Sequence, residues 1–222
     1  MRIFLDTASL AETQWALSVG LIDGVTTNPS LLAGELSDDD LTGHVAGLCR
    51  MVDGPVTVQL LSVTADDMYR EGRDLARIAD NLVLEIPMIE EGLIATRRLT
   101  ADGVRVSMTL VFSAAQALLA AKAGADFVSP FVGRLDDVGS DGIAVVADVR
   151  RIFDQSGLEC EIVASSIRTT RRFVDAVRAG AHAVAVPPAV LRSLLLHPLT
   201  DIGVDQFLND WSKRITRVRT SV

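Results

Sequence analysis

A glutamate stands in the middle of an apolar segment that is typical of a buried strand. Glu85 lies between Leu84 and Ile86 in the run Leu-Val-Leu-Glu-Ile-Pro. A carboxylate removed from water costs free energy unless it gains a partner or a proton, so burial raises its pKa. Glu85 is therefore either a catalytic acid or base, or a structural carboxylate paired with Arg134 or Arg168. The pattern favours catalysis.

A second carboxylate, Asp6, ends the first predicted strand. Aspartate is also a common helix N-cap. Ser9 can take that place instead, with Glu12 three residues later completing a capping box. We therefore expect Asp6 to point into the site that the strand ends form, as the second catalytic carboxylate.

Two arginines and a serine follow late strands in the chain. Arg134 comes after a glycine, and Arg168 follows Ser166 by two positions. The planar guanidinium fork suits phosphate, and a serine hydroxyl adds a donor. The pattern predicts a phosphate site at Arg134, Ser166 and Arg168, with two solvated surface arginines as the alternative.

The sequence predicts neither a metal site nor a cofactor. No histidines, cysteines and carboxylates occur at metal-ligand spacing. The three histidines are interpreted as structural: His44, His182 and His197. Cys49 and Cys160 lack redox or metal spacing and are expected to be reduced thiols of a cytoplasmic protein.

Short β-branched runs alternate along the chain with Ala- and Leu-rich amphipathic stretches. The predicted strands are Ile3–Asp6, Gly24–Thr26, Val56–Leu60, Leu82–Ile86, Arg105–Thr109, Phe127–Pro130, Glu161–Ala164 and Ala183–Val186. The predicted helices include Ala65–Ile78, Ile89–Ala101, Ser113–Ala123, Gly142–Gln155 and Thr170–Ala179. Eight such units imply a parallel α/β sheet closed into a (β/α)8 TIM barrel. An open doubly wound sheet normally has a Gly-rich turn after the first strand, which is Asp-Thr-Ala-Ser here.

In such a barrel the chemistry lies at the carboxyl ends of the strands. These ends are unusually polar in this chain, beyond the carboxylates and the predicted phosphate site. The further candidates for contact with a substrate are Asn28, Gln59, Ser107 and Thr109.

The chain has 222 residues and a net charge of −8, and it is read as one domain over residues 1–222. The acidic balance disfavours nucleic acid as a partner. No apolar run reaches the roughly 18 residues that cross a membrane, and no signal peptide is visible. Residues 205–222 form an amphipathic helix outside the eight units, with Phe207, Leu208, Trp211, Ile215 and Val218 on one face. This helix either caps the barrel or packs on another subunit.

Five motifs resemble those of the small transaldolase and fructose-6-phosphate aldolase family. They are Phe4-Leu-Asp-Thr-Ala8, Asp23-Gly-Val-Thr-Thr-Asn-Pro-Ser-Leu31, Ile86-Pro-Met88, Ser129-Pro-Phe-Val-Gly-Arg-Leu-Asp-Asp137 and Ala164-Ser-Ser-Ile-Arg168. The resemblance runs from Met1 to about Trp211. It implies a (β/α)8 barrel, a phosphorylated ketose as ligand and a ring-shaped homo-oligomer, a pentamer or decamer, whose C-terminal helix reaches a neighbouring subunit.

Residue by residue, the resemblance implies that Arg134, Ser166 and Arg168 bind phosphate. It implies that the reacting carbons are lined by Asp6, Asn28, Gln59 and Thr109. Phe131 matches the transaldolase-like choice at a position where the aldolase branch tends to have tyrosine.

The resemblance fails at the residue that carries the family's chemistry. The family has Lys-Ile-Pro-Met where this chain has Glu85-Ile-Pro-Met, and that lysine forms a Schiff base with the ketose. The usual asparagine on the next strand is Ser107. The two lysines of the chain, Lys122 and Lys213, lie away from the strand ends. A carboxylate cannot form the iminium that lets a carbon–carbon bond break.

Three functions remain open. The leading hypothesis is a ketose-phosphate epimerase or isomerase, such as one converting fructose 6-phosphate to allulose 6-phosphate at C3, with Glu85 and Asp6 as acid and base. The second is a transaldolase or aldolase that works without a Schiff base, or whose Glu85 is an introduced substitution. The third is a sugar-phosphate binding protein without catalytic activity.

Overall fold

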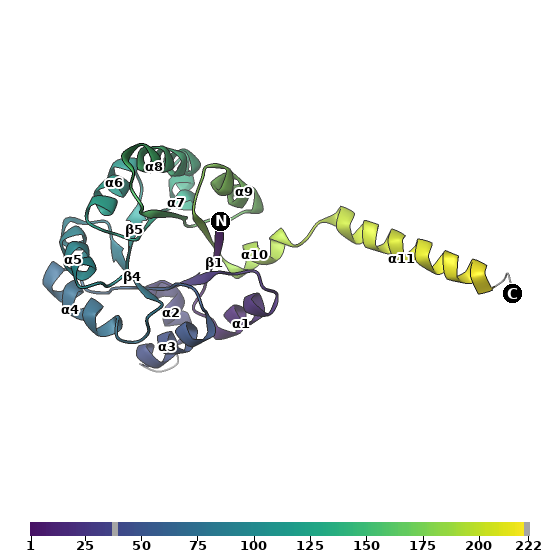
Figure 1. Ribbon diagram of the computed structural model, residues 1–222, viewed down its shortest axis with the longest axis horizontal. Helices are drawn as coiled ribbons and strands as arrows, with labels where there is room; N and C mark the ends of the chain where they lie inside the picture. The colour runs from purple at the N-terminus through teal and green to yellow at the C-terminus, as the bar shows by residue number, and fades with distance from the viewer. Residues whose placement is uncertain (37–39, 220–222) are drawn as a thin grey trace.

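The computed structural model describes the backbone of residues 1–36 and 40–219, and side chains within these ranges up to residue 213. In this part of the chain eight parallel strands close into a barrel in sequence order, with helices around it (Figure 1). The strands are β1 Arg2–Asp6, β2 Gly24–Thr26, β3 Val56–Gln59, β4 Leu82–Pro87, β5 Val106–Val111, β6 Phe127–Pro130, β7 Glu161–Ala164 and β8 Ala183–Val186. The predicted TIM barrel is confirmed.

The helices follow the strands as the β-α pattern predicts. They are α1 Leu10–Ser18, α2 Pro29–Glu35, α3 Leu41–Met51, α4 Ala65–Leu75, α5 Glu90–Ala101, α6 Ala114–Lys122, α7 Val132–Asp137, α8 Gly142–Ser156, α9 Thr170–Arg178, α10 Pro188–Leu194 and α11 Pro198–Arg219. No helix among the described residues is long and apolar enough to cross a membrane.

The strands bury two separate sets of apolar side chains because successive residues face opposite sides of a sheet. The outer set, with Leu84 and Ile86 from β4, packs against the helices. The inner set fills the amino-terminal half of the barrel and consists of Phe4, Val83, Phe127, Val163, Ala183 and Ala185. Glu85 therefore shares the inner face with Val83, and its apolar neighbours in sequence belong to a different layer.

The packing of this inner set, which plugs the amino-terminal half of the barrel, depends on a close approach between two strands. The rings of Phe4 and Phe127 meet edge to face at 6.4 Å. A Cβ atom on Gly24 would lie 2.8 Å from the Phe4 ring, so only glycine fits opposite that ring. The plug closes the amino-terminal half and leaves the polar inner residues near the carboxyl ends.

Two predictions about helix ends are wrong. Ser9 is the N-cap residue of α1, but its side chain makes no capping bond. Glu12 instead accepts a hydrogen bond of 2.6 Å from Arg192 of α10, so no capping box forms. The C-terminal helix begins at Pro198 and not at residue 205, since proline is well suited to the first helical position. Residues 220–222 of the predicted helix lie outside the described part of the chain.

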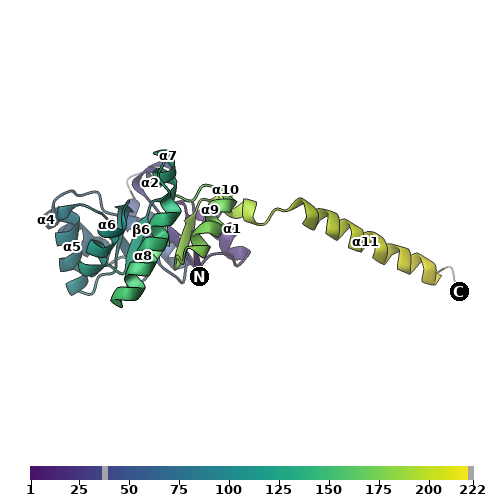
Figure 2. The ribbon, with the colours of Figure 1, turned by 90° about the horizontal axis from the view of Figure 1, so that it is seen from above.

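Helix α11 projects away from the barrel in both ribbon views (Figures 1 and 2). Its apolar side chains are exposed, with Phe207 at 77% and Trp211 at 60%. The side chains of Ile215 and Val218 lie outside the described residues. Within this chain α11 therefore does not cap the barrel.

Gly92 lets α5 approach the end of β4, two residues beyond Glu85. A Cβ atom there would lie 2.2 Å from the carbonyl oxygen of Pro87. We expect Gly92→Ala to lower the free energy of unfolding by about 1–3 kcal/mol, measured by urea denaturation. Gly47→Ala in α3 is the control, because its Cβ would meet nothing closer than 3.6 Å. That change should be neutral or stabilise by up to about 1 kcal/mol. Equal effects of the two substitutions would contradict the conclusion that α5 needs a glycine at position 92 to approach β4.

Candidate active site

A cavity of about 620 Å³ opens at the carboxyl ends of the strands. Nine of the ten predicted site residues line it: Asp6, Asn28, Gln59, Glu85, Thr109, Phe131, Arg134, Ser166 and Arg168. Ser107 is the exception. The barrel thus gathers these residues from seven βα units, while their chemical roles stay predictions.

Glu85 is buried on the inner face of β4, beside Gln59 of β3 in the parallel register. Its Oε1 accepts a hydrogen bond of 2.9 Å from the Thr57 hydroxyl. Burial raises the pKa of Glu85 to about 8; the Thr57 bond opposes that rise and the nearby Asp6 adds to it. A carboxyl group with this pKa exchanges protons near neutral pH.

The structural alternative for Glu85, an ion pair with an arginine, is not formed. Arg168 donates instead to Asp137, at 2.5 Å. The guanidinium of Arg134 lies over the Phe131 ring, 5.1 Å from its centroid. Among the described residues no cation forms a salt bridge with Glu85, which keeps its raised pKa.

Thr57 is a site residue that the sequence interpretation missed. It lies on β3 two positions before Gln59, so both face the barrel interior. Its backbone carbonyl accepts a bond of 2.7 Å from the hydroxyl of Thr27. Thr57 is thus fixed in place beneath the cavity, and the period-2 alternation from Gln59 was the signal that could have identified it.

Asp6 is at the cavity, as predicted. Its Oδ1 accepts a hydrogen bond of 3.2 Å from the hydroxyl of Thr26, a residue absent from the predicted site. Burial raises the pKa of Asp6, and the Thr26 bond opposes that rise. Two carboxyl groups with raised pKa therefore share one cavity.

Ser107 and Thr109 lie two residues apart along β5, and the register against β4 is unbroken from one to the other. The pairing of β5 with β6 shifts between Met108 and Val111, and Leu110 has a positive φ of 57°. Thr109 reaches the cavity. Ser107 pairs in register with Glu85 but is buried, and its hydroxyl lies 3.3 Å from that of Ser129. Ser107 therefore lies in the barrel interior and does not line the cavity.

Asn28, at the cavity rim, also caps a helix. Its side chain accepts a hydrogen bond of 3.0 Å from the backbone N–H of Leu31, at the start of α2. Across the cavity, the rings of Phe112 and Phe131 pack edge to face at 5.9 Å.

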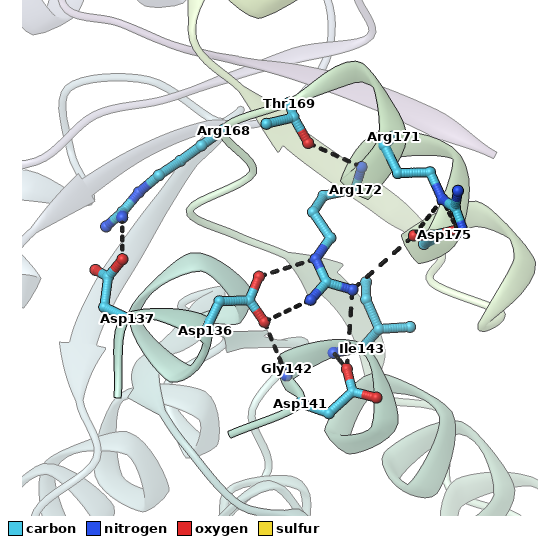
Figure 3. Close-up of polar contacts among 10 residues, drawn as sticks. All are labelled: Asp136, Asp137, Asp141, Gly142, Ile143, Arg168, Thr169, Arg171, Arg172 and Asp175. Atoms are coloured by element: carbon cyan, nitrogen blue, oxygen red, sulfur yellow. Dashed lines mark hydrogen bonds and ion pairs between the residues drawn. The ribbon is translucent and has the colours of Figure 1, made fainter. Parts of the chain in front are cut away.

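The predicted phosphate residues come together where α7 approaches the loop before α9. Ser166 has a positive φ of 59°, a strained backbone of the kind found at binding sites. A Cβ atom on Gly133 would lie 2.2 Å from the Ser166 carbonyl oxygen. Only glycine permits this approach, which brings Arg134 next to Ser166 and Arg168. Figure 3 shows Arg168 directed at Asp137.

Other titratable residues are excluded from the site by position. His44 contacts the Ala8 carbonyl oxygen at 2.7 Å, and His182 accepts from the Ile162 N–H near the amino end of β8. Neither lysine lines the cavity: Lys122 is in α6 and Lys213 in α11. Within the described ranges, no three histidine, cysteine or acidic side chains form a group that could hold a metal ion.

Comparison with known proteins identifies the family. The profile described as Transaldolase/Fructose-6-phosphate aldolase matches residues 3–218. The chain belongs to this family. A protein of Symbiobacterium thermophilum named "Probable transaldolase" is 48% identical over 218 residues, which are 98% of this chain and 100% of the relative. Proteins with the same name from Clostridium acetobutylicum (45% identical; 98% of this chain, 100% of the relative) and Thermodesulfovibrio yellowstonii (46%; 96% and 99%) are also similar.

Membership in the transaldolase/fructose-6-phosphate aldolase family confirms the resemblance inferred from the five motifs. The match extends from β1 into α11, so it includes every strand that contributes to the cavity. Glu85 thus lies in a barrel that matches the family over its whole length.

The raised pKa of Glu85 makes a prediction about stability. Between its ordinary pKa of 4.5 and about 8, the folded chain holds a proton that the unfolded chain releases. The free energy of unfolding should therefore fall as the pH rises through this range. Glutamine cannot ionise, so wild type should lose about 3 kcal/mol relative to Glu85→Gln between about pH 5 and about pH 8.

Urea denaturation of both proteins at several pH values measures this difference. Glu90→Gln, an exposed change outside the cavity, is the control and should track the wild type. A wild-type minus Glu85→Gln difference that stays constant with pH would mean that Glu85 titrates normally.

Proposed function

We propose that this chain is a sugar-phosphate enzyme that transfers protons through Glu85 and Asp6 without a Schiff base. The observation that carries the proposal is the buried, hydrogen-bonded Glu85 with a pKa of about 8, in a cavity with no lysine among its lining residues. Family membership supports a phosphorylated ketose as substrate. No resident cofactor is required.

The proposed substrate lies across the cavity with its phosphate at Arg134, Ser166 and Arg168. Arginine forks and a hydroxyl donor suit that group. Asp6 and Glu85 line the same cavity, so we place the ketose carbonyl beside strand β4. This arrangement would bring the carbon next to the carbonyl within reach of both carboxyl groups.

The reaction we favour is epimerisation at C3, such as fructose 6-phosphate to allulose 6-phosphate. One carboxylate removes the C3 proton, and the electron pair of that bond moves onto the carbonyl oxygen to give an enediolate. The other carboxyl group returns a proton to the opposite face. Asn28, Gln59 and Thr109 are the proposed donors to the oxyanion, each worth about 2.7–4 kcal/mol if well placed.

A transaldolase or aldolase reaction is the second candidate, and the names of the relatives favour it. Here a carboxylate removes the proton of the C4 hydroxyl, and the bond between C3 and C4 breaks. The C4 oxygen then becomes the carbonyl oxygen of a departing aldehyde, and the electrons of the broken bond give the enediolate of the shorter C1–C3 fragment. This enediolate is then protonated or captured by an aldehyde. Both candidates therefore share the carboxylates and differ in which bond to C3 breaks.

Incubation with ketose phosphates in D₂O tests these reactions. Epimerisation should place deuterium at C3 and form the epimer, both followed by NMR, and the rate should rise with pH through about 8 if Glu85 is the base. Glu85→Gln should lower turnover by at least about a hundredfold and leave binding of the sugar phosphate intact. Glu90→Gln is the matched control.

Other outcomes separate the alternatives. Aldehyde release without deuterium in the remaining ketose would favour the aldolase. Borohydride trapping of a covalent adduct would show a participating lysine and contradict the proposed mechanism. Ligand binding without either reaction, in folded protein, would leave only the binding-protein hypothesis.

We also propose that the chain is a cytoplasmic homo-oligomer, a pentamer or decamer by family resemblance, whose α11 packs on a neighbouring subunit. The exposed Phe207, Leu208 and Trp211 support this role, because monomeric proteins seldom expose such contiguous apolar side chains.

A charge on that face of α11 should weaken assembly. We expect Phe207→Glu to lower the oligomeric mass measured by light scattering, since burying a carboxylate without a partner is costly. Asn209→Glu adds the same charge on the other side of the helix and should leave the mass unchanged. An unchanged mass for Phe207→Glu would exclude this face as the interface.

A further inference from the structure

Two arginines and a backbone hydrogen bond join the segments that hold the proposed phosphate residues. Arg168 and Arg172 each donate to a carboxylate of α7, and the N–H of Val132 donates to the carbonyl oxygen of Ser165 at 3.0 Å. Arg134 belongs to α7, and Arg168 precedes α9. Beside the main cavity, a second hollow of about 420 Å³ lies between these segments. Figure 3 shows that Arg172 of α9 reaches across it toward α7 and the start of α8.

Arg172 forms a bidentate ion pair with Asp136 of α7. Its Nε and Nη2 donate to the two carboxylate oxygens of Asp136, each at 2.9 Å. Asp136 in turn accepts a bond of 3.3 Å from the N–H of Gly142, at the start of α8. Such a two-pronged pair fixes direction as well as distance, which a single ion pair does not.

Two further carboxylates surround Arg172. Its Nη1 lies 3.9 Å from Asp141, the N-cap residue of α8, and 3.9 Å from Asp175 of α9. The side chains of Arg172 and Asp136 are 34% and 26% exposed, less than the 53% of both Arg168 and Asp137. Arg172 is therefore the better-buried centre of a network that ties α7, α8 and α9 together.

The pair that directly involves the phosphate site is weaker. Arg168 contacts Asp137 through one nitrogen, Nη1, at 2.5 Å, and both side chains are half exposed. An arriving phosphate can compete for this guanidinium, since an exposed ion pair contributes little. The relative position of Arg134 and Arg168 must then come from elsewhere in the fold.

We infer that Arg172 is a positioning residue: through Asp136 it holds α7 against α9, so that Arg134, Ser166 and Arg168 face one phosphate group. This inference rests on the proposed sugar-phosphate function. Arg172 itself donates to Asp136 and is not among the residues that line the main cavity. Loss of the pair should let α7 and the loop before α9 shift apart, which weakens binding of phosphate.

Calorimetric titration of the full chain with inorganic phosphate tests the inference without any need for turnover. Arg172→Gln and Asp136→Asn should each weaken binding roughly tenfold, the size of effect usual for a residue that orients a ligand-binding group. Arg172→Lys, which keeps the charge and loses the fork, should also weaken it. The double variant should be no weaker than the single ones, because both remove the same pair.

Arg171→Gln is the matched control. Arg171 is the preceding residue of α9, its side chain is 81% exposed, and it forms its ion pair with Asp175. This change should leave the affinity for phosphate at the wild-type value. If Arg172 only stabilises the fold, its variants should have a lower melting temperature or a smaller fraction of protein that binds phosphate. The dissociation constant of the folded protein should then equal that of the wild type.

The outcomes are distinct. Wild-type affinity in Arg172→Gln, Arg172→Lys and Asp136→Asn, with wild type binding phosphate normally, would overturn the inference and spare the proposed function. If wild type binds neither phosphate nor a ketose phosphate, the proposed function fails, and the positioning role fails with it. If Arg172→Gln does not fold, the affinities of Arg172→Lys and Asp136→Asn for phosphate test the inference.

Discussion

A carboxyl group buried inside a closed barrel is the constraint around which the rest of this site is arranged. The carboxyl group of Glu85 is buried on the inner face of the barrel, and no cation among the described residues forms a salt bridge with it. The single bond from Thr57 only partly lowers the cost of ionisation. The cost of burial therefore appears as a raised pKa, which is the property that proton transfer requires.

Along the barrel axis, the residues of the apolar core and the polar residues of the proposed site lie in different halves. In the amino-terminal half, Phe4 and Phe127 fill the interior, and Gly24 makes room for the Phe4 ring. In the carboxyl-terminal half the same inner face becomes polar, at Thr57, Glu85 and Thr109. Apolar packing below thus supports polar residues above, and the strain at Ser166 lies in the polar half.

The polar residues at the predicted strand ends made much of this arrangement predictable. A carboxylate within an apolar run, as at Glu85, indicated a buried acid or base, and the motifs around Arg134 and Arg168 indicated the family. Other features resisted prediction. The burial of Ser107 below the cavity was one of them, and the shift of the β5–β6 register between Met108 and Val111 was another, because both depend on the neighbouring strands. The capping box failed because Glu12 has a partner, Arg192, that is distant in sequence.

The sequence by itself determined the barrel, the family and the replacement of a lysine by Glu85, because these follow from local periodicity and from residue identity. Only the tertiary structure decided how Glu85 is partnered, since Thr57, Asp6 and Glu85 come from three different strands. It also decided that Arg168 pairs with Asp137 and that Arg172 links α7 to α9. Such contacts depend on side-chain distances across the closed sheet, which no local pattern encodes.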